Sequence, residues 1–205
     1  MRRAMSTEPT AFIIDDDGAV RESIELLLQA RGIATRAFAD AQAFLDIYSH
    51  GLRGCVLADV RMPGVGGLDL QVRLNELGST LPVIVITGHG DVPMAVRAIK
   101  SGALDFLQKP FEAGVLEDLV RRGVALEAER RLEQQRIETE RARLALLTER
   151  ECQVLVSIAE GHYNRVIAEE LGISVSTVEA HRRKVMEKLR ADTVYDLVRM
   201  VDTYL

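Results

Sequence analysis

The fold is decided by the stretch Ala11-Phe12-Ile13-Ile14-Asp15-Asp16-Asp17, in which a short apolar run ends on three consecutive carboxylates. Three later runs have the same form, because each mainly apolar segment is followed at once by a polar side chain. They are Cys55–Ala58 before Asp59, Val83–Ile86 before Thr87-Gly88, and Phe106–Gln108 before Lys109-Pro110. Runs of this length are typical of strands that are buried on both faces of a parallel sheet.

Amphipathic stretches lie between these runs. The first has apolar residues at helical spacing from Val20 to Leu28 and is closed by Gly32. Four more helices are expected over residues 41–48, 68–77, 92–101 and 112–126. The alternation predicts an α/β fold of five β/α units around one parallel sheet. The carboxyl ends of parallel strands converge on one crevice, so we expect the polar residues that follow the strands to meet there.

The side chains expected in this crevice suit phosphoryl transfer. Clustered carboxylates repel one another, and a hard divalent cation such as Mg²⁺ relieves that repulsion. One carboxylate can act as the nucleophile and become an aspartyl phosphate. Asp59 is the candidate, because it ends the expected central strand. Lys109 would supply a positive charge and Thr87 a hydrogen bond to the phosphoryl oxygens.

The segment from residue 127 to 143 has a different character. It holds five Glu and five Arg but no Gly or Pro, which indicates a solvated charged helix that continues the preceding one. A coiled coil is the alternative, but the residues spaced by seven around Ile137 are Gly123, Arg130 and Leu144, which make a poor seam. We therefore expect a charged helical linker.

From Leu144 onward the pattern is purely helical and predicts four helices. Thr148 and Glu151 have the spacing of a capping box at the start of the first. A short second helix, 164–171, stops at Gly172, and a third begins after Ser174 or Ser176 and runs to about Leu189. A short helix, a turn and a capped helix are typical of a helix-turn-helix. The fourth helix carries an apolar stripe from Val194 to Val201. We expect this stripe to serve as the dimer seam on DNA, with part of it packed within its own domain.

The third of these helices can be phased at about 100° per residue. Val178, Val185 and Leu189 then lie on its core side. The residues expected to contact DNA lie opposite or at the flanks, and they are Ser176, Thr177, Glu179, Ala180, Arg183 and Lys184. Small Ala180 allows close approach to the bases and Arg183 is long enough to reach their edges. Thr177 and Lys184 suit phosphates, and Glu179 suits a cytosine amine. Arg182 is expected to pair with Glu169 or Glu170.

Composition limits the function classes. The formal net charge is −5, which argues against a protein that coats nucleic acid non-specifically. Residues 144–205 hold eight Lys and Arg against ten Asp and Glu, so a monomer should bind DNA weakly and two copies on adjacent half-sites much better. No apolar stretch reaches the ~18 residues of a membrane span. Cys55 and Cys152 are expected to be reduced thiols, with a redox role for Cys152 as the minority interpretation. We expect a cytoplasmic protein.

The first part of the chain resembles two-component receiver domains over about residues 9–126. The motifs that carry the resemblance are Ile14-Asp15-Asp16-Asp17, Asp59-Val60-Arg61-Met62-Pro63-Gly64, Thr87-Gly88-His89-Gly90-Asp91 and Lys109-Pro110-Phe111. The resemblance implies a flavodoxin-like (βα)5 fold with sheet order 2-1-3-4-5, a cis Lys109-Pro110 bond, and phosphorylation of Asp59 by a sensor histidine kinase. It also implies that Asp16, Asp59 and the backbone carbonyl of Arg61 hold Mg²⁺, with Asp15 acting partly through water. Thr87 and Phe106 would form the switch.

The last part, residues 144–205, resembles the LuxR-type helix-turn-helix. The resemblance rests on Leu147–Glu151, Gly161, Asn164, Ile167-Ala168, Leu171–Ser174 and Thr177–Arg182, with the DNA-binding motif from about Asn164 to Arg183. Together with the receiver, it makes the chain similar to FixJ-type response regulators. It implies a phosphorylation-driven homodimer that binds double-stranded promoter DNA, contacts RNA polymerase and activates transcription, and not an enzyme. Residues 127–143 form the linker.

Two other functions are compatible with parts of the pattern. An aspartyl-phosphate phosphatase could use the Asp59 chemistry, but the haloacid-dehalogenase pattern needs a second acid two residues later, where this chain has Arg61. An RNA-binding antiterminator could use a helical output domain. The basic helix with capping residues before it favours duplex DNA instead.

Overall fold

The computed structural model describes residues 8–88 and 92–204 of the 205-residue chain. The chain divides into two compact units, Met1–Arg131 and Leu132–Leu205. The first unit has two hydrophobic cores, one on each face of its sheet, and the second unit has one. No helix in the described ranges is long and apolar enough to cross a bilayer.

The first unit is built on a parallel five-stranded sheet with the order β2-β1-β3-β4-β5. The strands are β1 (Thr10–Ile14), β2 (Ala34–Phe38), β3 (Gly54–Asp59), β4 (Val83–Thr87) and β5 (Asp105–Gln108). Every residue of β3 is buried, as expected for the central strand of a doubly covered sheet. The order confirms the flavodoxin-like topology that the receiver resemblance implies.

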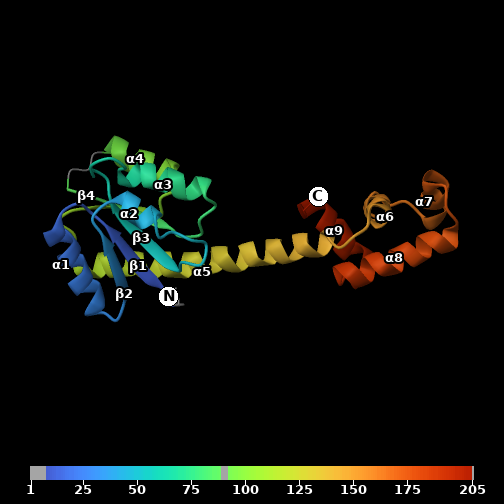
Figure 1. Ribbon diagram of the computed structural model, residues 1–205, viewed down its shortest axis with the longest axis horizontal. Helices are drawn as coiled ribbons and strands as arrows, with labels where there is room; N and C mark the ends of the chain where they lie inside the picture. The colour runs from blue at the N-terminus through green and yellow to red at the C-terminus, as the bar shows by residue number, and fades with distance from the viewer. Residues whose placement is uncertain (1–7, 89–91, 205) are drawn as a thin grey trace. The chain divides into compact units, whose positions relative to one another are not determined.

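The helices form one layer on each face of this sheet (Figure 1). They are α1 (Gly18–Gln29), α2 (Ala41–Leu45), α3 (Gly67–Glu76), α4 (Val92–Lys100) and α5 (Ala113–Leu144). Side chains alternate along β1, so Phe12 and Ile14 pack in one core with residues of α2, α3 and α4. Ala11 and Ile13 pack in the other core with residues of α1 and α5. Two cores separated by one sheet fix the strand ends that carry the polar residues.

Strand β2 lies at the edge of the sheet and had no apolar run to identify it. Its sequence, Ala-Thr-Arg-Ala-Phe, has one buried residue, Phe38. The guanidinium of Arg36 lies 5.2 Å from the centre of the Phe38 ring, where a cation is attracted by the ring face. Helix α2 is shorter than expected, since it ends at Leu45 and not near Tyr48.

Helix α5 is continuous from Ala113 to Leu144, which confirms that the charged segment prolongs the last receiver helix. Its first part packs on the sheet through Leu116, Leu119 and Val120. Glu127 is an exception to the solvated face, because its carboxylate is buried and accepts hydrogen bonds from Arg131 Nε at 3.1 Å and Thr80 Oγ1 at 3.3 Å.

The second unit contains α6 (Glu149–Ala159), α7 (Asn164–Leu171), α8 (Val175–Leu189) and α9 (Val194–Tyr204), together with the last turns of α5. The four helices confirm the sequence expectation. Thr148 and Glu151 form the predicted capping box. Gly172 ends α7 with φ of +65°, which suits glycine, and Ser174 is the residue that caps α8.

Candidate functional site

Asp59 and Asp15 meet at the carboxyl ends of the two central strands, as the sequence predicts. Asp59 ends β3 and Asp15 follows β1, and both side chains are buried. The ammonium of Lys109, which follows β5, bridges them. Its Nζ lies 2.6 Å from Asp15 Oδ2 and 2.8 Å from Asp59 Oδ1. The trio therefore carries one positive charge on a half-buried side chain and two negative charges on buried ones.

Backbone amides orient the two carboxylates. Asp59 Oδ2 accepts a hydrogen bond of 2.7 Å from the amide of Arg61, and Asp15 Oδ1 accepts one of 2.9 Å from the amide of Asp17. Gly67 begins α3 directly beside this loop, where an added Cβ would lie 2.5 Å from the Asp59 carbonyl oxygen. The loop after β3 thus depends on a residue with no side chain.

The charge of Lys109 is stabilised by its two partners. Burial alone would lower the pKa of this ammonium, but the hydrogen bonds and charges of Asp15 and Asp59 outweigh that effect and raise the pKa above its ordinary value. Lys109 is therefore a permanent cation at neutral pH. A fixed cation beside a carboxylate can stabilise negative charge that arrives on that carboxylate.

The other predicted receiver residues lie on β4, on β5 and on the loop after β1. Thr87 ends β4 and is buried, Asp16 is exposed on the loop next to Asp15, and Phe106 is half-buried on β5 against the core that holds α4. Asp17 caps α1 by accepting a hydrogen bond of 2.8 Å from the amide of Ala19. The Lys109-Pro110 bond is cis, as the receiver resemblance implies. Three residues of the Thr87–Asp91 motif, His89 to Asp91, lie outside the described residues.

The donor set fits a hard divalent cation, although it is not assembled as a metal cage. Among residues 8–88 and 92–204, no three His, Cys, Asp or Glu side chains are grouped closely enough to hold a metal ion. The structure brings Asp15 and Asp59 together about Lys109 and leaves Asp16 exposed beside them. One ammonium does not balance two buried carboxylates, and the excess negative charge with oxygen donors is what Mg²⁺ prefers.

In the second unit, α8 presents the predicted DNA-contacting residues to solvent. Val178, Val185 and Leu189 are fully buried, which confirms the helical phase. The six residues assigned to DNA are all exposed, namely Ser176, Thr177, Glu179, Ala180, Arg183 and Lys184. Ser174 Oγ, the cap of α8, lies 2.8 Å from Ser176 Oγ and 2.7 Å from Thr177 Oγ1, so these hydroxyl groups are held together at the start of the helix.

One expectation for this unit is not met, and another is met in part. The predicted pairing of Arg182 is absent, because Glu169 instead pairs with Arg165 at 3.3 Å and Glu170 lies 3.4 Å from His162 Nδ1. The α9 stripe packs partly within its own domain, as one of the two sequence interpretations expected. Leu197 is fully buried and Val201 packs against the unit's own core, whereas Val194 is 42% exposed.

Sequence reasoning also missed an ion pair that joins two helices. Lys188 near the end of α8 places Nζ 2.6 Å from Oε2 of the buried Glu151 in α6. The capping box identified Glu151, but only tertiary packing brings Lys188 to it. The Lys188 hydrogen bond is the leading cause that lowers the pKa of Glu151 to about 2.

Comparison with known proteins agrees with this geometry. Residues 11–121 match the family described as response regulator receiver domain, and residues 145–201 match bacterial regulatory proteins, luxR family. The transcriptional regulatory protein FixJ of Azorhizobium caulinodans is 48% identical over 189 residues, which cover 92% of this chain and 89% of that protein.

Two solved structures extend over nearly the whole chain. The response regulator StyR is 41% identical with a TM-score of 0.83, and the match covers 96% of this chain and 100% of StyR. Full-length FixJ from B. japonicum is 40% identical with a TM-score of 0.58, and the match covers 96% and 97% of the two chains. With the buried Asp59–Lys109 pair in one unit and the exposed α8 face in the other, these matches show that the chain belongs to the FixJ-type two-component response regulators, which join a receiver domain to a LuxR-type DNA-binding domain.

Proposed function

We propose that this response regulator is switched by phosphorylation of Asp59 and then regulates transcription as a DNA-bound dimer. A phosphohistidine on a sensor histidine kinase would be the donor. The P–N bond of the donor breaks as a bond forms between phosphorus and a carboxylate oxygen of Asp59. The observation that carries the proposal is the position of Asp59, buried at the end of β3 with Oδ1 2.8 Å from Lys109 Nζ.

Mg²⁺ is the cofactor of this proposal. Asp16, Asp59 and the carbonyl of Arg61 would hold it, with Asp15 acting partly through water. When bound, the ion neutralises charge on the transferring phosphoryl group. Lys109, which follows β5, contributes a second positive charge and contacts Asp59. The loop at Arg61 keeps the carboxylate oriented through its amide.

Thr87 and Phe106 would transmit the change. A phosphoryl group on Asp59 attracts the Thr87 hydroxyl, and Phe106 then fills the space that this movement opens. Helix α4 lies next to Phe106 in one core, and its Val92, Val96 and Ile99 side chains are exposed. An exposed apolar stripe on the element that moves supports a phosphorylation-dependent homodimer.

The output is binding to double-stranded promoter DNA. We assign residues 9–126 to the receiver, 127–143 to the linker and 144–205 to the DNA-binding domain, with the motif from about Asn164 to Arg183. The exposed α8 residues Ala180 and Arg183 would read base edges, while Thr177 and Lys184 would contact phosphates. Bound as a dimer, the protein would recruit RNA polymerase and activate transcription. The protein would thus act by forming a complex with DNA in the bacterial cytoplasm, and not by catalysing a reaction.

Acetyl phosphate tests the first step without the kinase. With Mg²⁺, the parent protein should gain the mass of one phosphoryl group and shift promoter DNA more strongly than before. Asp59→Asn should show neither change. Asp17→Asn is the control, because Asp17 lies beside the site but caps α1 and an amide oxygen can keep that cap. An Asp59→Asn protein that gains the same mass would refute the proposal.

A further inference from the structure

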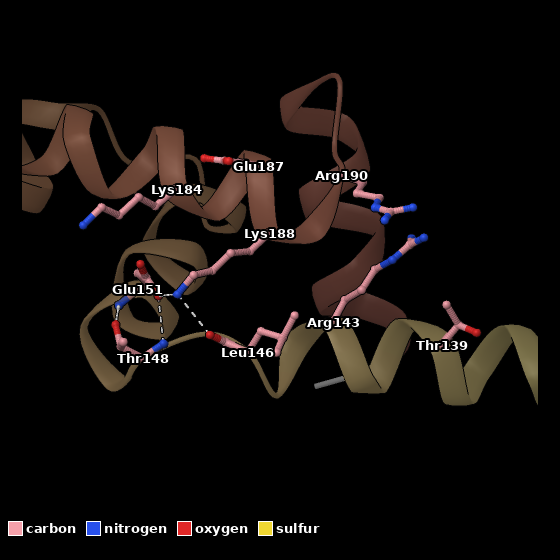
Figure 2. Close-up of a pocket in the computed structure, with 9 residues that line it drawn as sticks. All are labelled: Thr139, Arg143, Leu146, Thr148, Glu151, Lys184, Glu187, Lys188 and Arg190. Carbon is pink, nitrogen blue, oxygen red and sulfur yellow. Dashed lines mark hydrogen bonds and ion pairs between the residues drawn. The ribbon is translucent and has the colours of Figure 1, made fainter.

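A charged cavity lies beside α8 on the side of its last two turns, outside the helix-turn-helix motif. Its volume is about 750 Å³, and it is lined by the last turns of α5, the start of α6 and the end of α8. The charged residues of its wall are Arg143, Lys184, Lys188, Arg190, Glu151 and Glu187. Four cations face two carboxylates, so the wall has a formal charge of +2 (Figure 2).

The cationic side chains of this wall differ in how many of their hydrogen-bond donors are already bonded within the protein. Lys188 is occupied, because its Nζ donates to Glu151 Oε2 at 2.6 Å and to the Leu146 carbonyl at 3.0 Å. Arg143 keeps part of its donor set, since only Nη1 bonds to Glu140 Oε1, at 2.8 Å. Arg190 is exposed, and among the described residues no carboxylate lies within 4.0 Å of its guanidinium. It is a cation with all its donors available.

Arg143 and Arg190 both line this cavity, and in Figure 2 both side chains extend to the same side of the view. Two guanidinium groups on the wall of one cavity favour a bound anion, because the anion offsets their like charges. The positive charge of this wall contrasts with the composition of the whole unit, because residues 132–205 hold eleven Lys and Arg against thirteen Asp and Glu. A net-acidic unit that gathers positive charge on one surface has the electrostatic form of an anion-binding site.

We propose that Arg190 and Arg143 bind a backbone phosphate of the operator DNA, beyond the phosphates contacted by the helix-turn-helix motif. This inference rests on the proposed DNA-binding function. The choice of DNA over a free anion comes from continuity. Lys184 lines the cavity and directly follows Arg183, the residue assigned to base edges on the exposed side of α8. A duplex seated on that side brings further phosphates past the end of the helix.

The chemistry of the two side chains suits this ligand. A guanidinium offers a planar pair of N–H donors that matches two phosphate oxygens. Arg143 belongs to the last turn of α5, so the proposal gives the linker helix a direct contact with DNA. The footprint on DNA would then include the junction between linker and DNA-binding domain, and linker substitutions could change affinity without touching the recognition residues.

The test uses the full chain and a fluorescent duplex, with affinity measured by anisotropy at several salt concentrations. Arg190→Gln should weaken binding roughly three- to tenfold at low salt and reduce the slope of log affinity against log salt by about one. Arg143→Gln should act in the same direction, and Arg190→Lys should keep most of the salt slope because it keeps the charge. The fold-loss of affinity should be equal for specific and random duplexes, since a contact with a phosphate does not depend on the base sequence.

Arg150→Gln is the matched control. It removes one exposed arginine from the same unit, but Arg150 bonds to Gln153 and does not line the cavity. If Arg190→Gln has the salt slope of the Arg150→Gln control while the parent binds DNA normally, the inference is wrong and the proposed function stands. If the parent shows no salt-dependent DNA binding, the proposed function fails first. Inorganic phosphate separates the anion sources, because stabilisation by phosphate that Arg190→Gln abolishes without loss of DNA affinity would identify a small-anion site and overturn the proposal.

Discussion

Lys188 in the last turn of α8 holds its Nζ 2.6 Å from Oε2 of Glu151 in the first turn of α6. The same carboxylate oxygen accepts a hydrogen bond of 2.8 Å from the amide of Thr148, and Lys188 also donates to the carbonyl of Leu146 (Figure 2). The side chain of Glu151 is only 4% exposed. This pair therefore fixes α8 to the segment that follows α5.

Replacing Lys188 by Met should destabilise residues 132–205 by about 2 kcal/mol, because a buried carboxylate would lose its cation. Urea unfolding followed by tyrosine fluorescence measures this, since three of the four tyrosines belong to that unit. Arg150→Met is the comparison, as its side chain is exposed. Equal urea midpoints for the two variants would mean that the pair contributes nothing measurable.

The same pair makes the second unit sensitive to acid. The hydrogen bond from Lys188 and that from the Thr148 backbone lower the pKa of Glu151 from 4.5 to about 2 in the folded state. A group with a depressed pKa stabilises the fold above its unfolded pKa, and that stability is lost as pH falls through the folded value. We expect the loss between about pH 4.5 and 2. The Glu151→Gln variant should have a lower free energy of unfolding than the parent at pH 7. That free energy should also change less with pH between about 4.5 and 2.

A methyl group at position 67 should disturb the loop that follows Asp59 at the end of β3. The Cβ of an alanine there would lie 2.5 Å from the carbonyl oxygen of Asp59 and 3.2 Å from Cβ of Ala58, so the loop or α3 must shift. Gly67→Ala should reduce the rate of phosphorylation by acetyl phosphate by about tenfold, because a 1 Å displacement of a reacting group is costly. Gly114→Ala is the control, as nothing lies within 4 Å of its Cβ position. Equal rates for both variants would contradict this account.

Lys109 should oppose metal binding while it favours the phosphorylated state. Its ammonium contacts one oxygen of Asp15 and one of Asp59, and a cation at the same carboxylates experiences that charge. Lys109→Met should bind Mg²⁺ about tenfold more tightly by calorimetry, since a neighbouring unit charge typically changes such affinities by that order. Under the proposed mechanism, the variant should also lose the increase in DNA affinity that is expected on phosphorylation. Unchanged Mg²⁺ affinity would indicate that Lys109 moves away when the metal binds.

The strand ends were predictable because a buried parallel strand is an apolar run, and a polar residue after it marks the functional edge of the sheet. Asp59 and Lys109 were found this way. The edge strand β2 was not, since Thr35 and Arg36 interrupt its apolar character. The phase of α8 was predictable for a similar reason, because Val178, Val185 and Leu189 have helical spacing and are fully buried.

Contacts between long flexible side chains were not predictable from spacing. Arg182 was expected to reach α7, but Arg165 and Glu169 are four residues apart on that helix and pair within it. The Glu151–Lys188 pair joins residues 37 positions apart, and only the packing of α6 against α8 brings them together. Sequence identifies which faces are buried, whereas the partners of charged side chains depend on the assembled helices.

The last prediction separates base reading from helix support on α8. Arg183 is exposed and Arg182 is half-buried in the wall of a second cavity with Glu179 and Val194. Arg183→Ala should relax the preference at one base position by about 1–3 kcal/mol in a selection from random duplexes, because the variant lacks the guanidinium that is proposed to contact a base edge. Arg182→Ala should instead lower the unfolding midpoint of the domain and leave the selected sequence unchanged. The opposite pattern, an altered sequence for Arg182→Ala and an unaltered one for Arg183→Ala, would mean that the helix meets the groove with a different face, since neighbouring residues point about 100° apart.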